Sequence, residues 1–512
     1  MFSDTSDFLG TVRKTSLYLM ANMIGKSIEK LAKKMEKVVE LQRWQNEHIE
    51  SEYDLERLFS EVRSGFVSQP CPDYQTRLEA LKQLKGALIE QQKALVEALN
   101  ADYGYRSQFD TTLGDLLPAI SHINYTIKHL KKWMKSSRRE SGLMLFPSQV
   151  RVEYQPLGVV GVIVPWNFPI LLSVAPIVTA IAAGNRVMVK LSEYTPKTNQ
   201  VLRMVFSAVE QRVYAVEGDV QIARCFSELP FDHLIFTGST PVGRLVAQAA
   251  AKNLTPVTLE LGGKSPVIVD NEVDLKHAVD AVMLGKSVNS GQICVAPDYV
   301  LVPQGKEQAF IQLYLQRYKA IYLKGGGADS VTQIINDAQF SRLKALLEDA
   351  KQHGAKVHAI EGVDVEGRRM LPHLISGVTE EMRVTQEEIF GPILPVFGYK
   401  SLSDVFAYIN QKPRPLALYL ISNDKVLQRQ VVEHTHSGGV AINDTILHVA
   451  ADDAPFGGIG DSGLGHYHGK EGFLTFSKAK TVLTSPNWLP RSRLLLRYRN
   501  WATRLLSKLF IR

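Results

Sequence analysis

The sequence contains little cysteine, and this scarcity excludes whole classes of protein. Only three cysteines occur in 512 residues, at Cys71, Cys225 and Cys294. Three thiols cannot build a disulfide framework, and their spacings match no zinc-binding pattern. We therefore expect a reducing compartment and interpret the protein as cytoplasmic.

The sequence also lacks a segment suited to secretion or to crossing a membrane. Asp4 and Asp7 precede every basic residue and no compact apolar region follows, so a cleaved signal peptide is not expected. The run from 158 to 184 carries no charge, but three prolines interrupt it. Because proline removes a helical hydrogen bond and clashes with the preceding turn, a strand, a loop and a buried helix explain this run better than a membrane span.

Acidic residues are absent from the C-terminal end of the chain. The formal net charge is +7, and the last 22 residues hold seven Lys or Arg and no acid. The rest of the chain is formally neutral, so no nucleic-acid partner is predicted. Within residues 486–512, Leu494, Trp501 and Leu505 approximate one face of a basic amphipathic helix. Such a helix suits peripheral contact with an anionic membrane, here the inner membrane surface; docking on the same protein or on a dimer mate is the alternative.

Hydrophobic periodicity predicts the secondary structure of the remaining chain. Residues 11–50 repeat apolar side chains every three or four positions, which predicts a helix in an N-terminal extension over 1–52. A second helix is predicted from Arg77 to Asn100. The segments from 158 to 190 then follow a strand–helix–strand order, as in a parallel, doubly wound sheet of an α/β protein.

The segment FTGSTPVG joins a predicted strand to a predicted helix. Gly238 and Ser239 lie in its turn, and Gly243 lies in the first helical turn. Backbone N–H groups at a helix N-terminus, reached through glycine, suit a pyrophosphate. The spacing is not GxGxxG, so a plain strand-to-helix turn remains an equal alternative.

Three charged residues lie at or beyond predicted strand ends. Lys190 and Glu193 could hold ribose hydroxyls, or they could be ordinary charges of a solvated loop. Glu260 interrupts the apolar strand VTLEL, and an unpaired buried carboxylate is costly. Desolvation would raise the Glu260 pKa and suit it to act as a general base. An ion pair with a basic residue elsewhere is the alternative.

Cys294 lies in the stretch NSGQICVAP, among small and amide side chains. A reactive thiol must be reachable, and its thiolate must be stabilised. A carbonyl that this thiol attacks would become an oxyanion in need of donors, and the amide of Asn167 in PWNFP could supply one. A packing site for small residues is the alternative.

These segments, in this order, resemble the aldehyde dehydrogenase superfamily. The matching stretches are PWNFP, KLSEYTP, FTGS, LELGGKSP, NSGQICVAPDYV, EEIFGP and PFGG, between Val159 and Gly458. The APDYV stretch and the ending GDSGLGHYHGKEGFLTFS are similar to the class 3 branch, and most similar to bacterial coniferyl aldehyde dehydrogenases. Gly460 stands where many members have Lys, which agrees with the class 3 branch and weakens any transfer of specificity from other branches.

The resemblance implies a catalytic role for three residues. Cys294 would be the nucleophile that forms a thiohemiacetal and then a thioester. Asn167, with the Cys294 backbone N–H, would hold the oxyanion. Glu260 would activate the water that releases the carboxylic acid.

The resemblance also implies a nicotinamide cofactor. The residues expected to bind it are Trp166, Lys190, Glu193, Gly238, Ser239, Gly243, Glu388 and Phe390. In EEIFGP the ribose-binding carboxylate of the family is the second Glu, which is Glu388. Glu193 favours NAD, because its carboxylate would bond a ribose 2′-OH and repel a 2′-phosphate; NADP remains open.

The fold implied by the resemblance is a Rossmann-like cofactor domain, an α/β catalytic domain and a small β bridging element. The NAD(P)-binding domain would cover 53–261, interrupted by a β arm near 138–156, and the catalytic domain 262–435. Residues 436–485 would return to the cofactor domain and complete the bridging element. A homodimer is expected.

The implied function is NAD(P)-dependent oxidation of an aldehyde to its carboxylic acid. The aldehyde could be aromatic or cinnamyl-type, such as coniferyl aldehyde, or medium- to long-chain aliphatic. An enzyme that passes the acyl group to coenzyme A and a non-catalytic scaffold that keeps the fold are the alternatives. No metal is expected, because the His-x-His pairs at 434–436 and 466–468 lack HExxH or a carboxylate-rich partner set.

Overall fold

The computed structural model describes residues 51–324 and 328–511. The chain divides into two compact units, 1–51 and 52–512, and the fold of the second unit is described below. The helix predicted over residues 11–50 lies outside the described residues, as does nearly all of the predicted N-terminal extension.

A six-stranded sheet contains the predicted strand–helix–strand pattern. Its strand order is β15-β7-β6-β3-β4-β5, and all neighbours are parallel except the β15–β7 pair. The strands are β3 (Val159–Ile163), β4 (Arg186–Lys190), β5 (Val213–Val216), β6 (His233–Thr237), β7 (Val257–Glu260) and β15 (Gly463–Leu464). Every residue of β3 is buried, as expected for a parallel strand covered on both faces.

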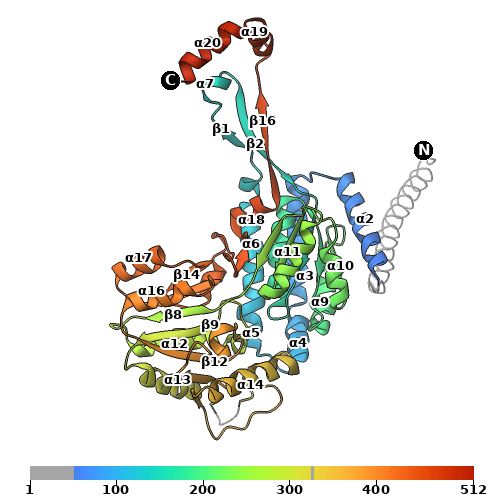
Figure 1. Cartoon of the computed structure of the whole chain (residues 1–512). Helices are drawn as coiled ribbons and strands as arrows, with labels where there is room; N and C mark the ends of the chain where they lie inside the picture. Colours follow the sequence, from blue (N-terminus) through green and yellow to red (C-terminus); the bar gives the residue numbers. More distant parts are fainter. Residues whose placement is uncertain (1–50, 325–327, 512) are drawn as a thin grey trace, which may run out of the picture. The chain divides into compact units, whose positions relative to one another are not determined.

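Helices pack against both faces of this sheet (Figure 1). One group consists of α3 (Tyr74–Glu90), α4 (Gln92–Tyr103), α6 (Leu117–Trp133), α8 (Pro169–Ala183) and α9 (Pro196–Ser207). The other consists of α2 (Glu52–Ser68), α10 (Val220–Ser227) and α11 (Thr240–Ala251). Helix α8 begins at a proline and ends at the left-handed Gly184, where the sequence predicted its end.

The sequence predicted one continuous helix where the structure has two. The segment from Arg77 to Asn100 forms two helices, because the backbone of Gln91, at φ −90° and ψ 6°, leaves the helical region between α3 and α4. The apolar stripe of Leu81, Leu84 and Leu88 is nevertheless fully buried. The helical period therefore indicated the buried face correctly but did not reveal the break.

A seven-stranded sheet follows in the chain. Its order is β10-β11-β12-β9-β8-β13-β14, and only β10 is antiparallel to its neighbour. The strands are β8 (Ser265–Val269), β9 (Pro297–Pro303), β10 (Lys356–Ala359), β11 (His373–Ser376), β12 (Ile393–Tyr399), β13 (Ala417–Ile421) and β14 (Gly439–Ile442). Its helices are α12 (Leu275–Ser287), α13 (Glu307–Tyr322), α14 (Asp337–Gln352), α15 (Arg383–Gln386), α16 (Leu402–Gln411) and α17 (Lys425–His434). Because β14 pairs with β13, this sheet extends beyond the domain boundary expected at 435. Together the two sheets confirm the predicted α/β class.

A third, antiparallel sheet joins distant parts of the chain. It consists of β1 (Ser137–Arg139), β2 (Gln149–Pro156) and β16 (Ser477–Thr484) in the order β1-β2-β16. Helix α18 (Gly469–Thr475) precedes β16, and helices α7 (Gly142–Leu145), α19 (Arg491–Arg497) and α20 (Arg499–Phe510) lie at the far end of the sheet (Figure 1). The helix predicted over 486–512 starts later and breaks at Tyr498, whose φ of −112° is not helical. Among the described helices, none combines the length and the apolar character needed to cross a membrane.

Candidate active site

A strained turn between α12 and β9 positions Cys294. The short helix Val288–Gly291 contains Asn289 and Ser290 at φ 50° and 52°, values that residues other than glycine rarely adopt. Buried hydrogen bonds hold this conformation, because Asn289 Nδ2 donates to the Gln292 carbonyl at 3.2 Å and Ser290 Oγ donates to the Thr332 carbonyl. Such strain, locked by buried contacts, is typical of a functional site.

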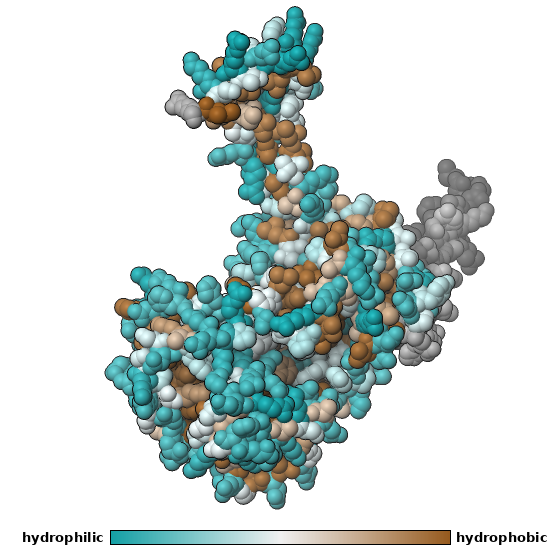
Figure 2. Space-filling view, viewed as in Figure 1, coloured by the Kyte–Doolittle hydropathy of each residue, from teal (hydrophilic) through white to brown (hydrophobic). Residues whose placement is uncertain are grey.

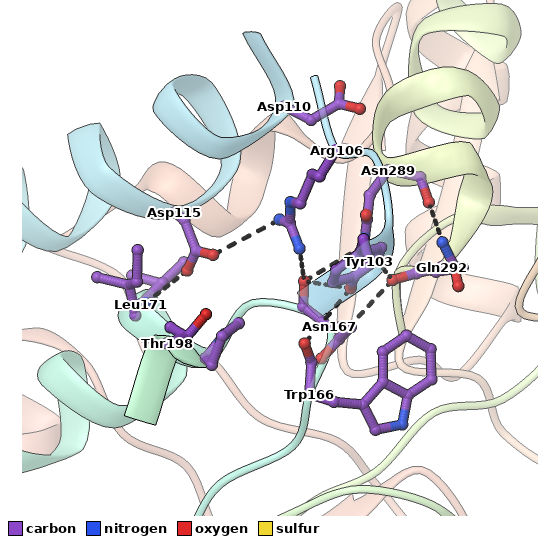
Figure 3. A network of polar contacts seen from close by, with 12 residues as sticks. Tyr103, Arg106, Asp110, Asp115, Trp166, Asn167, Leu171, Thr198, Asn289 and Gln292 are labelled. Atoms are coloured by element: carbon purple, nitrogen blue, oxygen red, sulfur yellow. Dashed lines mark hydrogen bonds and ion pairs between the residues drawn. The ribbon is translucent and has the colours of Figure 1, made fainter. Parts of the chain in front are cut away.

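Asn167 connects the PWNFP turn to this cysteine loop. Its Nδ2 donates to the Gln292 carbonyl at 3.2 Å, two residues before Cys294 (Figure 3). Its own backbone carbonyl accepts hydrogen bonds from Arg106 Nη1 at 2.6 Å and from Asn289 Nδ2 at 3.3 Å. The Asn167 side chain is buried, so these contacts determine where the amide lies relative to the thiol.

Arg106 is a buried cation that joins this network through the backbone carbonyl of Asn167. It forms an ion pair with Asp115 at 3.5 Å, and both side chains are fully buried (Figure 3). Asp115 lies in a π-helical turn, Thr112–Leu116, and its Oδ1 accepts a hydrogen bond from the Leu171 N–H at 2.7 Å. Burial raises the pKa of Asp115 to about 6, although Arg106 opposes this shift. The network therefore connects the segment before α6 to the start of α8.

The charges of two carboxyl groups act on the Cys294 thiol. Burial raises the pKa of Cys294 to about 12, and the charges of Glu388 and Glu260 add to this shift. An isolated thiol with this pKa is a poor nucleophile at neutral pH. A neighbouring carboxylate that accepts its proton would overcome this barrier.

Glu260 lies at the end of β7 and is buried. Neither carboxylate oxygen accepts a hydrogen bond from any residue that the structure describes. Desolvation alone raises its pKa well above the ordinary value. The ion pair that could have explained a buried carboxylate is thus absent from the described part of the chain, whereas the raised pKa suits a general base.

Glu387 and Glu388 differ sharply in their surroundings. Glu387 forms an ion pair with Arg383 at 2.8 Å on a part-exposed surface. Glu388 lies beside Gly262, where any Cβ would collide with the Glu388 carboxylate. Burial, and then the charge of Asp298, raise the pKa of Glu388 to about 8. Of the two residues, Glu388 is therefore the one with the buried carboxyl group, and it lies beside Gly262.

Trp166 and Phe390 meet edge to face, with their ring centroids 5.4 Å apart. Trp166 directly precedes Asn167, and Phe390 has a φ of 50°. These two rings bring the residues of PWNFP and EEIFGP into contact, although more than 200 positions separate them in the sequence.

The turn after β6 has the form of an anion site. The Gly238 N–H donates to the Glu260 carbonyl at 3.0 Å, and a Cβ at Gly238 would collide with the Phe236 ring. Ser239 is the N-cap residue of α11, but its side chain makes no capping hydrogen bond. The first backbone N–H groups of α11 are therefore suited to a phosphate. Gly243 allows α11 to pack closely on Leu261, since a Cβ there would overlap that side chain.

Lys190 and Glu193 form an ion pair at 3.0 Å at the carboxyl end of β4. The Lys190 side chain is 2% exposed and that of Glu193 is 37% exposed. This edge of a parallel sheet is where such folds bind nucleotides. The buried cation, the part-exposed carboxylate, the open helix N-terminus and the aromatic pair together fit a dinucleotide.

Several residues at the site were not predicted from the sequence. Arg106 and Asp115 support Asn167, and no periodicity distinguished them from surface residues. Lys286 in α12 is 2% exposed, and burial lowers its pKa to about 8. Its Nζ has no hydrogen-bond partner among the described residues, yet LGKS looks in the sequence like an ordinary helix end.

The histidine pairs considered as metal ligands have separate surroundings. His468 is buried near His122, with ring centroids 5.1 Å apart, and His122 Nδ1 lies 3.2 Å from Asp452 Oδ1. His466 is exposed. Within the described residues, no group of three or more His, Cys, Asp or Glu is arranged to hold a metal ion.

Comparison with known proteins identifies the family. The profile of the Aldehyde dehydrogenase family matches residues 52–482. The chain belongs to this family. The enzyme therefore oxidises an aldehyde to the carboxylic acid with a nicotinamide cofactor, as predicted. Neither the scaffold alternative nor the coenzyme A alternative finds support.

Individual relatives confirm the predicted branch. The enzyme is 49% identical over 462 residues to the "Probable coniferyl aldehyde dehydrogenase" of Pseudomonas aeruginosa, covering 90% of this chain and 96% of the relative. It is 37% identical over 432 residues to "Aldehyde dehydrogenase family 3 member I1, chloroplastic" of Arabidopsis thaliana, covering 83% and 78%. The solved structure "Substrate bound state of Staphylococcus Aureus AldH" matches with a TM-score of 0.80 and 35% identity, covering 88% of this chain and 99% of that one.

Proposed function

We propose that the enzyme oxidises a phenolic, cinnamyl-type aldehyde such as coniferyl aldehyde, with NAD, through a thioester on Cys294. The observation that supports this most is that the charges of Glu260 and Glu388 act on the buried Cys294 thiol, while the Asn167 amide binds the Gln292 carbonyl of the same loop. The substrate class is supported by the relatives named as coniferyl aldehyde dehydrogenases.

The first step is addition of the Cys294 sulfur to the aldehyde carbon. The thiol proton passes to a neighbouring carboxylate, and the carbonyl oxygen becomes an oxyanion. The Asn167 amide has two N–H groups, and one of them donates to the Gln292 carbonyl. The second N–H, with the Cys294 backbone N–H, stabilises the oxyanion of the thiohemiacetal.

The second half of the reaction depends on the cofactor and then on Glu260. A bound nicotinamide would supply the hydride acceptor that converts the thiohemiacetal on Cys294 into a thioester. Glu260, in its carboxylate form, takes a proton from the water that attacks this thioester. The carboxylic acid leaves, and Cys294 regains a proton.

Each part of the cofactor is assigned to residues whose position and charge suit it. Lys190 and Glu193 would bind the adenine ribose, and the Gly238–Ser239 turn would approach the pyrophosphate. Trp166, Glu388 and Phe390 would position the nicotinamide end. The carboxylate of Glu193 would accept a hydrogen bond from a ribose 2′-OH and repel a 2′-phosphate, which favours NAD over NADP.

A homodimer is proposed from the third sheet. Strand β16 pairs with β2 along one edge, and its other edge has no strand partner in the described chain. An open edge of eight residues is a template for pairing with a second copy. Sedimentation should give twice the mass of the 57.1 kDa chain, and a monomer mass would contradict the proposal.

Peripheral membrane contact is proposed for the far end of the same sheet. Exposed apolar side chains gather there from α7, α19, α20 and the preceding loop: Leu143, Met144, Phe146, Trp488, Leu496, Trp501 and Phe510. Arg491 Nη2 connects α19 to α7 by donating to the carbonyls of Leu145 and Phe146. Hydrophilic and apolar side chains lie side by side at this end (Figure 2), and residues 491–512 contain no acid. An anionic lipid surface suits this combination.

Liposome co-sedimentation tests the membrane proposal. The full chain should sediment with vesicles that contain phosphatidylglycerol more than with pure phosphatidylcholine vesicles. A chain that ends at residue 490 should lose this preference. Equal sedimentation of both chains would overturn the proposal.

Turnover with a panel of aldehydes tests the substrate and the cofactor. Coniferyl aldehyde, benzaldehyde and aldehydes from hexanal to hexadecanal would be supplied with NAD or NADP, and product analysis would identify the free acid. We expect the highest kcat/KM for coniferyl aldehyde with NAD, and no turnover by Cys294→Ala. Preference for a long aliphatic aldehyde, or for NADP, would contradict the proposal.

A further inference from the structure

His448 is a part-buried histidine whose ring nitrogens have no hydrogen-bond partner among the described residues. It lies in the short 3-10 helix Leu447–Ala450, after β14. Neither Nδ1 nor Nε2 bonds to any residue in the described parts of the chain. Two buried nitrogen atoms without hydrogen bonds destabilise the folded protein unless a ligand supplies the missing partner.

The position of His448 places it close to the nucleophile. Its ring packs against Tyr419, with centroids 5.8 Å apart, and Tyr419 Oη donates to the Val295 carbonyl at 2.5 Å. The residue before Val295 is Cys294. One tyrosine side chain therefore separates the imidazole from the cysteine loop.

The imidazole and the thiol share apolar neighbours. Cys294, Ile446 and Phe456 pack against one hydrophobic cluster, and the Phe456 ring lies 6.4 Å from the His448 ring. An aromatic aldehyde that is bound at Cys294 would therefore have apolar side chains near its ring.

The imidazole is in the neutral form at physiological pH. Burial lowers the pKa of His448 to about 4. A neutral ring offers one N–H donor and one acceptor nitrogen. A phenolic hydroxyl, which can donate and accept, is the complementary group.

We infer that His448 determines specificity by hydrogen bonding the para-hydroxyl of a phenolic aldehyde whose carbonyl lies at Cys294. This inference rests on the proposed function, because it assigns the group that recognises the phenol of that substrate class. A para-hydroxyl on cinnamaldehyde lies one double bond and one ring away from the carbonyl, and one tyrosine ring separates His448 from the Val295 carbonyl next to Cys294. A site that meets a hydroxyl with a buried partner discriminates strongly against a substrate without it.

The test compares 4-hydroxycinnamaldehyde with unsubstituted cinnamaldehyde, using the purified full chain and NAD. In His448→Phe, the ratio of the two kcat/KM values should fall at least tenfold, mainly through a higher KM for the hydroxylated aldehyde. His448→Gln, which keeps donor and acceptor atoms, should recover most of the ratio. His466→Phe, at an exposed histidine, is the matched control and should leave the ratio at the wild-type value.

Different results separate this inference from the proposed function. A wild-type preference for the hydroxylated aldehyde that survives in His448→Phe would overturn the role of His448 alone. Equal losses on both aldehydes in His448→Phe and His448→Gln would show a structural role and also overturn it. A wild-type enzyme that shows no preference for the hydroxylated aldehyde would contradict the proposed substrate class together with the inference.

Discussion

Asn167 donates a hydrogen bond from Nδ2 to the carbonyl of Gln292 at 3.2 Å, two residues before Cys294. This bond fixes the amide of the PWNFP turn relative to the loop that carries the thiol. Arg106 binds the backbone carbonyl of Asn167 and not its side chain, so this hydrogen bond remains when the Asn167 side chain is replaced.

Asn167→Ala should therefore impair catalysis more than folding. Loss of one oxyanion donor typically lowers kcat by about 10²- to 10³-fold. We expect a loss of that size, with KM little changed and with a Tm near the wild-type value. The measurement is steady-state kinetics beside thermal unfolding; a loss of kcat below about tenfold in a folded variant would contradict the oxyanion role.

Glu260→Gln should slow the release of acid and remove one limb of the pH profile. Since burial raises the pKa of Glu260 well above its ordinary value, the side chain is protonated and inactive as a base at lower pH. The wild-type kcat should rise as pH increases through this raised pKa and then level off. The variant should lose about 10²- to 10⁴-fold in kcat and show no such rise. An unchanged pH profile in the variant would exclude Glu260 as the titrating base.

Glu193→Gln should relax the preference for NAD. The substitution keeps a hydrogen-bond acceptor for the ribose but removes the charge that repels a 2′-phosphate. We expect kcat/KM with NADP to rise about tenfold relative to NAD, which corresponds to ~1.4 kcal/mol. Glu217→Gln is a suitable control, because Glu217 pairs with Arg203 at 3.2 Å and has no proposed ribose contact. If Glu217→Gln raised the relative activity with NADP more than Glu193→Gln did, the proposed contact of Glu193 with the ribose would be wrong.

Asp115→Ala should destabilise the fold strongly. It would leave the Arg106 guanidinium buried without its ion-pair partner. Removal of one partner from a buried pair costs about 3–5 kcal/mol. Glu348→Ala breaks the exposed Glu348–Lys351 pair and should cost less than about 1 kcal/mol. Denaturant unfolding measures both, and similar losses would contradict the structural role of Asp115.

The sequence predicted the strands better than the tertiary contacts that hold the candidate site. Apolar runs such as VVGVI specify a buried strand, and the glycine at 184 ends a helix for a local reason. Glu260 ends a strand of one sheet and acts by its charge on Cys294, which precedes a strand of the other sheet, so their relationship depends on tertiary packing that no local pattern encodes. Arg106 and Asp115 looked like ordinary charged residues, because only tertiary burial makes them a supporting pair. Nothing in the sequence indicated the helix break at Gln91 either, because the apolar stripe continues through α4.

The central claim is that the acyl group of the substrate is carried on Cys294. Rapid acid quenching of the enzyme with NAD and 4-hydroxycinnamaldehyde, followed by peptide mass spectrometry, tests this claim most directly. The peptide containing Cys294 should carry the acyl group, with a larger amount in Glu260→Gln than in wild type and none in Cys294→Ala. Turnover to the free acid without an acyl group on Cys294 in either enzyme, or with the group on Cys71 or Cys225, would contradict it.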